Sequence, residues 1–159
     1  MSTHRIGVIS DTHGLLRPKA LDALRGSELI IHAGDVGRPE ILDALREIAP
    51  VMAVRGNVDR GAWASALPEW QVVAAGPVRF YVLHDANYLG HFGVNAAAPG
   101  YAAIISGHTH RPSIARRDGV LWLNPGSAGP RRFTLPVTVA VIDVIEGVLH
   151  PRLIELPPA

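Results

Sequence analysis

The sequence contains no cysteine, and this absence narrows the chemistry that the chain can perform. Without thiols there are no disulfides, no thiolate metal ligands and no cysteine nucleophile. Long apolar runs are also missing, so we expect no membrane span and no membrane partner. The charges nearly balance, with 15 lysines and arginines against 14 aspartates and glutamates, which predicts no bulk attraction to nucleic acid. A chain without cysteine suits a reducing compartment, and we expect a cytoplasmic protein.

The sequence does contain enough apolar material for one globular domain. Of its 159 residues, 48% are hydrophobic and 18% are charged, which is typical of a folded chain rather than a disordered one. The 16 glycines and 13 prolines are spread along the chain as turn signals and form no linker. We therefore expect a single domain over residues 1–159.

The order of the predicted elements indicates an α/β fold with two sheets. In the first half, short β-branched runs predict buried strands, and segments opened by proline predict amphipathic helices between them. The second half predicts hairpins around tight turns that contain glycine. Two packed sheets with helices outside would bury the apolar residues of both halves of the chain. The predicted segments are Arg5–Ser10, Pro18–Arg25, Glu28–Ala33, Pro39–Ile48 and Val51–Arg55, then hairpins over 70–83, 114–124 and 137–156, with Asn95–Gly100 fitting a short helix or a loop.

The most informative pattern is a side chain that can bind a metal ion, placed directly after each of five apolar runs. Ligands in open α/β sheets bind beyond the carboxyl ends of the strands, so we expect these side chains to converge. The steps from one motif to the next are 24, 22, 27 and 24 residues, each suited to one strand with its connection. The motifs are Asp11-Thr12-His13, Gly34-Asp35, Gly56-Asn57, His84 and Gly107-His108-Thr109-His110. Together they predict a metal-dependent hydrolase.

Each motif taken alone has a simpler explanation. Asp11 and Asp35 could each cap a turn or a helix, and the Gly-Asn dipeptide is a common turn. A single histidine beside a core, such as His84, is more often a packed structural residue than a ligand. His108 and His110 are harder to explain in this way, because two neighbouring imidazoles need hydrogen-bond partners or an ion. Five such coincidences in this order are far rarer than one shared site.

At these residues the sequence resembles the calcineurin-like metallophosphoesterases, whose pattern is Asp-x-His, Gly-Asp, Gly-Asn, His and Gly-His-x-His. The match runs in order from Asp11 to His110. It continues into Asn124-Pro125-Gly126-Ser127, which is similar to a later loop of the small single-domain phosphodiesterases of that family. The resemblance implies a two-sheet β-sandwich flanked by helices, in four layers α-β-β-α, in agreement with the predicted elements.

The resemblance also implies two divalent cations and a role for each motif residue. Two cations about 3.5–4 Å apart lower the pKa of a bridging hydroxide, which attacks phosphorus in line. Oxygen and imidazole ligands suit manganese as the first choice, with nickel, iron or zinc as alternatives. The implied ligands are Asp11, His13 and His110 for one ion and Asn57, His84 and His108 for the other, with Asp35 as the bridge. The residues implied in catalysis are Asp35, Asn57, His84 and His108.

Two positions depart from the family pattern. Many members have a histidine after the Gly-Asn that helps to protonate the leaving group, but this chain has Val58, which cannot act as an acid. We therefore predict that phosphodiesters of acidic alcohols react best. The small phosphodiesterases usually have glycine after the fourth motif, but here Asp85 follows His84. Asp85 would either strain a tight turn or orient an imidazole from outside the coordination sphere.

The sequence thus predicts a two-metal-dependent phosphodiesterase that hydrolyses a small phosphodiester by attack of a metal-bridging hydroxide. Among the arginines of the second half, Arg111 is nearest to the motifs and is expected to bind the substrate phosphate. Two alternatives remain open: a phosphomonoesterase or nucleotide hydrolase with the same site, and a non-catalytic protein-binding scaffold of the retromer-subunit type. The retained ligand positions favour chemistry over the scaffold. A homo-oligomer also fits, because the exposed strand edges of a small sandwich are often covered by a second subunit.

Overall fold

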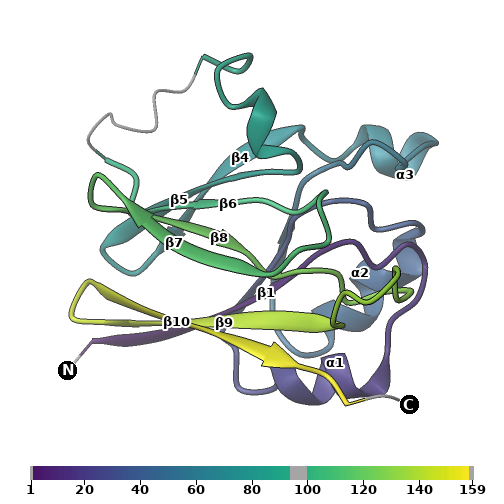
Figure 1. Cartoon of the computed structure of the whole chain (residues 1–159), viewed down its shortest axis with the longest axis horizontal. Helices are drawn as coiled ribbons and strands as arrows, with labels where there is room; N and C mark the ends of the chain where they lie inside the picture. Colours follow the sequence, from purple (N-terminus) through teal and green to yellow (C-terminus); the bar gives the residue numbers. More distant parts are fainter. Residues whose placement is uncertain (1, 94–99, 158–159) are drawn as a thin grey trace.

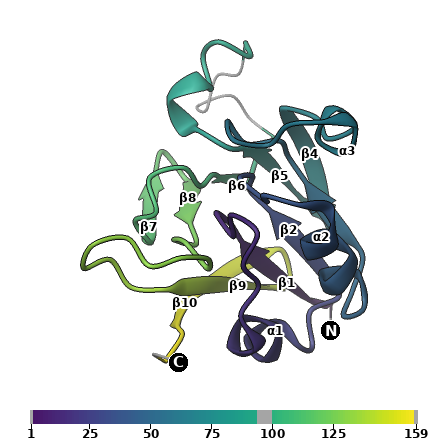
Figure 2. The ribbon, with the colours of Figure 1, turned by 90° about the vertical axis from the view of Figure 1, so that its right-hand side faces the viewer.

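The computed structural model describes residues 2–93 and 100–157 and shows two five-stranded sheets packed face to face (Figure 1, Figure 2). The strand order is β10-β9-β1-β2-β3 in the first sheet and β4-β5-β6-β8-β7 in the second. The strands are β1 (Thr3–Ile9), β2 (Leu29–His32), β3 (Val51–Ala53), β4 (Trp70–Ala75), β5 (Val78–Leu83), β6 (Ala103–Ile105), β7 (Ser113–Arg117), β8 (Val120–Asn124), β9 (Thr138–Ile145) and β10 (Val148–Glu155). The helices are α1 (Pro18–Leu24), α2 (Pro39–Arg46), α3 (Ala62–Ser65) and the 3₁₀ turn η1 (Ala86–Tyr88).

The first sheet is built from alternating strands and helices. β1, β2 and β3 run parallel, with Ile6 opposite Leu29 and Ile30 opposite Val51. Parallel neighbours need a crossover connection, and α1 and α2 supply the two crossovers. The last hairpin, β9–β10, pairs antiparallel with β1 and completes the sheet. The carboxyl ends of the three parallel strands therefore lie at one edge.

The two crossover helices form where the proline-led amphipathic patterns predicted them. Each has proline in its first turn, where the missing N–H costs nothing. In α2, Ile41, Leu42 and Leu45 form the buried stripe, while Glu40 and Arg46 complement the helix dipole. The helices end one and two residues before the predicted Arg25 and Ile48. Both lie against the outer face of the first sheet (Figure 2).

The second sheet combines hairpins with parallel pairs. The predicted hairpins β4–β5 and β7–β8 are confirmed, with Trp70 opposite Leu83 and Ser113 opposite Asn124. β5, β6 and β8 run parallel to one another. The carboxyl ends of β5 and β6 are therefore neighbours, as those of β1 and β2 are in the first sheet.

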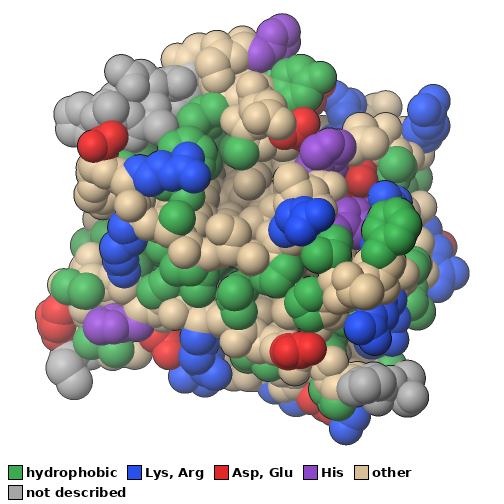
Figure 3. All heavy atoms as spheres, viewed as in Figure 1, with side chains coloured by type: hydrophobic (Ala, Val, Ile, Leu, Met, Phe, Trp, Pro, Cys, Tyr) green, Lys and Arg blue, Asp and Glu red, His purple; other side chains and the backbone are tan. Residues whose placement is uncertain are grey.

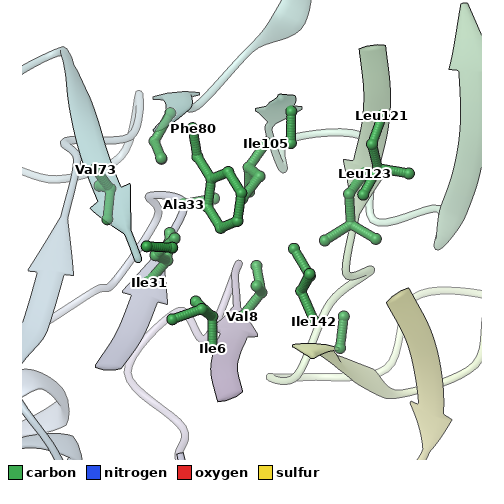
Figure 4. Close-up of a cluster of buried hydrophobic side chains, with 14 of the residues drawn as sticks. Ile6, Val8, Ile31, Ala33, Val73, Phe80, Ile105, Leu121, Leu123 and Ile142 are labelled. Carbon is green, nitrogen blue, oxygen red and sulfur yellow. The ribbon is translucent and has the colours of Figure 1, made fainter. Parts of the chain in front are cut away.

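The main core lies between the two sheets (Figure 4). Val8 and Ile31 of the first sheet meet Phe80 and Ile105 of the second, and all four side chains are fully buried. Burying one such side chain contributes about 1.5–3 kcal/mol to stability. This core holds the sheets in a fixed relative position, so the strand ends of both sheets are brought to the same side.

The outer face of the second sheet has a thinner cover than the outer face of the first. Its apolar residues, including Tyr81 and Ile104, pack against Leu89 and Phe92 from the segment around η1. Within residues 2–93 and 100–157, this segment is the helical layer on that side. The short helix α3 was not predicted, and the segment Asn95–Gly100, which fitted a short helix or a loop, falls outside the described residues except for its last position.

None of the helices in the described part of the chain has the length and apolar composition needed to cross a bilayer.

Candidate metal centre

All seven predicted ligand residues meet where strands of both sheets end. Each motif begins within about three residues of the end of its strand, and the loops that leave β1 and β6 lie on the right in Figure 1. In the space-filling view, histidine and acidic side chains come together on the upper right of the same face (Figure 3). Asp11 and His13 follow β1, Asp35 follows β2, Asn57 follows β3, His84 follows β5, and His108 and His110 follow β6.

The backbone at these positions is unusual. Asp11, His13, Asp35, His108 and His110 all have positive φ angles, between 46° and 72°. Residues other than glycine rarely adopt this left-handed conformation, and such strain concentrates at functional sites. Five of the eight non-glycine residues with positive φ in the described part of the chain are predicted ligands. The fold therefore holds these residues in conformations that their own preferences do not favour.

The first group consists of Asp11, His13 and His110. The Nε2 atoms of His13 and His110 lie 3.3 Å apart, and Asp11 Oδ1 lies 3.5 Å from His110 Nε2. Asp11 is fully buried, and its Oδ1 has no hydrogen-bond partner among the described residues. An unpaired buried carboxylate oxygen is costly unless a cation neutralises it. This group therefore fits a metal ion.

The second group consists of Asp35, His84 and His108, with Asn57 beside them. The side-chain oxygen of Asn57 lies 2.9 Å from His84 Nε2 and 3.2 Å from His108 Nδ1. His84 donates its Nδ1 proton to the carbonyl oxygen of Ala33 at 2.7 Å, because a carbonyl can only accept. The neutral tautomer then directs the Nε2 lone pair of His84 towards the group, as a metal ligand requires.

Asp35 lies between the two groups. Its Oδ2 is 3.2 Å from His84 Nε2 and 3.6 Å from His13 Nε2. Its Oδ1 accepts a hydrogen bond of 3.0 Å from the backbone N–H of Val58. Oδ1 thus holds the Asp35 carboxylate in place, while Oδ2 faces one histidine of each group. This is the placement expected for a residue that contacts two ions.

The electrostatics of the site favour a bound cation. Burial raises the pKa of the Asp11 carboxyl to about 6. Burial lowers the pKa of His110 to about 4, and the charge of Arg132 lowers it further. Burial also lowers the pKa of His13. Neutral imidazoles present lone pairs to a metal, and a cation would offset the cost of an ionised Asp11.

Two glycines make room for the acidic ligands. A Cβ on Gly56 would collide with the backbone nitrogen and Oδ1 of Asp35. A Cβ on Gly107 would collide with the Ser10 hydroxyl, which donates a 2.8 Å hydrogen bond to Asp11 Oδ2. The glycines of the Gly-Asn and Gly-His motifs therefore serve close packing around the two carboxylates.

Asp59 and His32 support the site from outside, and neither is among the predicted ligands. Asp59 is buried and accepts hydrogen bonds from the backbone N–H groups of Val36, Gly37 and Gly56, which ties the loops after β2 and β3 together. His32 accepts from the N–H of Gly34 through Nδ1, so its Nε2 donates to the Thr12 hydroxyl at 3.0 Å. These bonds fix the loops that carry the ligands.

Asp85 does not strain its turn, because its φ is −119°. Its Oδ1 accepts from the backbone N–H of Asn87 and caps η1. Its Oδ2 lies 3.6 Å from His108 Nε2, the ring nitrogen that faces away from Asn57. Of the two explanations that the sequence left open, the geometry favours Asp85 as an outer partner of a ligand imidazole.

A cavity of about 400 Å³ opens beside the second group, a volume within the usual range for small-molecule sites. Its lining residues are Arg55, Gly56, Asn57, Glu69, His84, Asp85, Tyr88, His91, Phe92 and His108. Arg111 is exposed and is not among them; its backbone N–H bonds the hydroxyl of Thr109. The charge of Arg132, in contrast, acts on both His13 and His110.

The fold and the site together define a two-sheet α/β sandwich. At its strand ends lie two groups of residues, each of which could hold a metal ion. The chain belongs to the calcineurin-like phosphoesterase superfamily, whose domain matches residues 5–147. It is 40% identical over 151 residues to a probable metallophosphoesterase of Methanothermobacter thermautotrophicus, covering 87% of this chain and 86% of that protein. The family predicted from the motifs is thereby confirmed, and with it the general class, a metal-dependent phosphoesterase.

Solved structures confirm the fold. An archaeal phosphodiesterase superposes with a TM-score of 0.79 at 24% identity, covering 96% of this chain and 99% of that one. Vacuolar protein sorting 29 from Cryptosporidium parvum superposes with a TM-score of 0.74 at 18% identity, covering 98% and 99%. The predicted sandwich of two sheets flanked by helices is therefore correct.

Proposed function

We propose that the chain is a two-metal phosphodiesterase that hydrolyses a small phosphodiester. The observation that supports this most directly is the position of Asp35, whose Oδ2 lies 3.2 Å from His84 Nε2 and 3.6 Å from His13 Nε2. One carboxylate oxygen close to a histidine of each group is suited to bridge two cations. The kinship with probable metallophosphoesterases and the likeness to an archaeal phosphodiesterase also support the proposal.

In this proposal the residues of the chain bind the cations and orient the substrate phosphate, and no side chain acts as the nucleophile. Two divalent cations supply a nucleophile from water at neutral pH and neutralise charge on the phosphoryl oxygens. Asn57, His84 and His108 line the cavity and would hold the second ion there, beside the bound phosphate. Val58 fixes Asp35 through its backbone N–H but offers no proton to a leaving group. Asp11, His13 and His110 would hold the first ion.

The charges around the cavity favour a diester over a monoester. Arg55, the one arginine among the lining residues, pairs with Glu69 at 3.3 Å. Asp85 adds a second carboxylate to the lining. The second negative charge of a monoester would meet these carboxylates without a free arginine in the lining, whereas a diester carries only one charge. Arg111 remains a proposed phosphate contact, and we propose Arg132 as a second one because its charge acts on His13 and His110.

Manganese is the proposed ion, with nickel, iron or zinc as the alternatives for the same ligands. We further propose that residues 1–159 act as one catalytic domain in the cytoplasm, on a small substrate rather than on nucleic acid. The formal net charge of +1 supports the last point.

The test is hydrolysis of bis(4-nitrophenyl) phosphate by metal-stripped protein, with and without added Mn²⁺, compared with 4-nitrophenyl phosphate. We expect turnover that requires the ion, prefers the diester and is lost in Asp35→Asn. Asp43→Asn is the matched control, because Asp43 lies exposed on α2 in a surface pair with Arg46. Preference for the monoester would overturn the diesterase assignment. No turnover with any of the four ions, in protein that folds normally, would favour the scaffold alternative.

A further inference from the structure

The cavity beside the second ligand group is lined by two chemically different sets of residues. One set consists of the predicted metal ligands Asn57, His84 and His108. The other set consists of three neighbouring rings, Tyr88, His91 and Phe92, from the segment around η1. We refer to these three residues as the aromatic wall. The reaction proposed above uses the first set and leaves the aromatic wall without a role.

The aromatic wall is held in place by packing and hydrogen bonds. The Asp85 carboxylate caps η1, and Leu89, 7% exposed, anchors the segment on the second sheet. Phe92 packs against the same apolar cluster and donates its N–H to the Tyr88 carbonyl at 3.1 Å. The aromatic wall therefore has a fixed position relative to His84 and His108, the predicted ligands that Asp85 adjoins.

Within the wall, Tyr88 and Phe92 each pack edge to face with His91 rather than stacking flat on it. His91 lies 5.9 Å from Tyr88 and 5.4 Å from Phe92 between ring centroids, at interplanar angles of 85° and 70°. Tyr88 keeps 54% of its surface exposed. A large aromatic side chain that lines a cavity and is this exposed offers an apolar face to a ligand.

The charges around the wall limit what the ligand can be. Arg55 is the one permanent cation among the lining residues, and Glu69 already pairs with it. Beyond the metal ligands, the described lining residues thus offer aromatic rings but no permanent cation that is left unpaired for a second phosphate group. The portion of the substrate that lies there should be flat, aromatic and uncharged.

We propose that the aromatic wall binds an aromatic ring esterified to the substrate phosphate. The substrate class is then a monoanionic phosphodiester with an aryl or nucleobase-bearing ester group, rather than a dialkyl diester or a polyphosphate. This inference rests on the proposed function for the placement of the phosphate at the metal ligands. Stacking of the substrate's aromatic ring on Tyr88 accounts for the preference for aromatic over alkyl esters.

The test measures binding to Mn²⁺-loaded protein by isothermal titration calorimetry, so that it does not depend on turnover. The probes are diphenyl, dicyclohexyl and diethyl phosphate, which share one negative charge, and the methyl ester of thymidine 5′-monophosphate. Diphenyl phosphate should bind about 10-fold more tightly than diethyl phosphate, as expected for stacking of one ring. It should also bind more tightly than dicyclohexyl phosphate, which is similarly apolar but not flat. The thymidine ester distinguishes a nucleoside from a simple aryl group.

Variants separate the aromatic wall from other surfaces. Tyr88→Ala should remove the preference for diphenyl phosphate, and Tyr88→Phe should keep it. Phe133→Ala is the matched control, because Phe133 is 94% exposed and does not line the cavity. Circular dichroism checks that each variant is folded.

Equal affinity for diphenyl and diethyl phosphate would overturn the inference, and so would a preference that survives Tyr88→Ala. An aromatic preference in binding without hydrolysis of any diester would refute the proposed function and leave the inference intact. Hydrolysis of diesters without an aromatic preference in binding would support the proposed function and overturn the inference.

Discussion

His84 donates its Nδ1 proton to the carbonyl oxygen of Ala33 at 2.7 Å, and this bond joins the two sheets at the candidate site. Ala33 follows β2 of the first sheet, and His84 follows β5 of the second. The bond fixes the tautomer of His84, so that Nε2 faces Asn57 and Asp35. Burial alone would lower the pKa of His84, but Asp35 and Asp11 outweigh burial and raise it. A cation among these oxygens would take the place of the proton on Nε2.

Asp85→Gly should weaken metal binding, because Asp85 Oδ2 lies 3.6 Å from the outer nitrogen of His108. Loss of such an outer partner typically lowers metal affinity by about 10- to 100-fold. Asp85→Asn, which keeps an oxygen to cap η1, isolates the effect of the charge. Competition for Mn²⁺ with a fluorescent chelator measures the change, and Asp118→Asn in the β7–β8 turn is the control. An unchanged affinity in Asp85→Gly would show that His108 needs no such support.

Gly107→Ala should damage both stability and the first ligand group. The new Cβ would collide with the Ser10 hydroxyl and come within 2.7 Å of Asp11 Oδ2. Overpacking of this kind costs about 1–3 kcal/mol of unfolding free energy. Urea denaturation and the chelator competition measure the two effects. Gly90→Ala is the matched control, because nothing lies within 4 Å of the position of its Cβ. Equal damage from both substitutions would contradict the proposed close contact.

The rate of hydrolysis should depend steeply on the leaving group. Val58 occupies the position after the Gly-Asn motif, and a valine cannot protonate a departing alkoxide. A series of aryl methyl phosphates with graded phenol pKa values should therefore show kcat falling as the pKa rises. Val58→His should make the dependence shallower, since the Val58 side chain is 41% exposed and leaves room for an imidazole. A flat dependence in the wild type would mean that another group donates the proton.

His32 should remain neutral in the folded protein well below the pH at which a free histidine becomes charged. Burial lowers its pKa from 6.5 to about 3. Between these two values the unfolded state binds more protons, so the unfolding free energy rises with pH from about 3 to about 6.5 and is reduced by acid. Long-range ¹H–¹⁵N correlation spectra should show His32 protonated on Nε2 alone at pH 5. Exposed His150 on β10 serves as the internal comparison, and titration of His32 near 6.5 would contradict the prediction.

The predicted ligands could be found in the sequence because each lies directly beyond an apolar strand. A strand of known direction carries its next residues to the sheet edge, so Asp11 and Asp35 are placed by local pattern alone. The same holds for the hairpins, whose turn residues are adjacent in sequence. Their roles as metal ligands remain a prediction, although the structure brings all seven together.

Other features of the site have no local signal. Asp59 binds three backbone N–H groups, two of which belong to the loop after β2, and no short motif relates these segments. The packing of the aromatic wall has no local signal either, since Tyr88 and Phe92 lie in a segment without clear periodicity. α3, with four residues, is too short to produce a helical pattern.

By itself, the sequence determined which strands form, which residue types follow them and to which family the chain belongs. These depend on local preferences and on the order of motifs along the chain. Only the tertiary structure decided that Asp35 lies between two groups, that Asp85 adjoins His108 and that the aromatic rings line the same cavity as the predicted ligands. The physical reason is that these distances depend on how the two sheets pack, and close packing is a property of the whole core rather than of any segment.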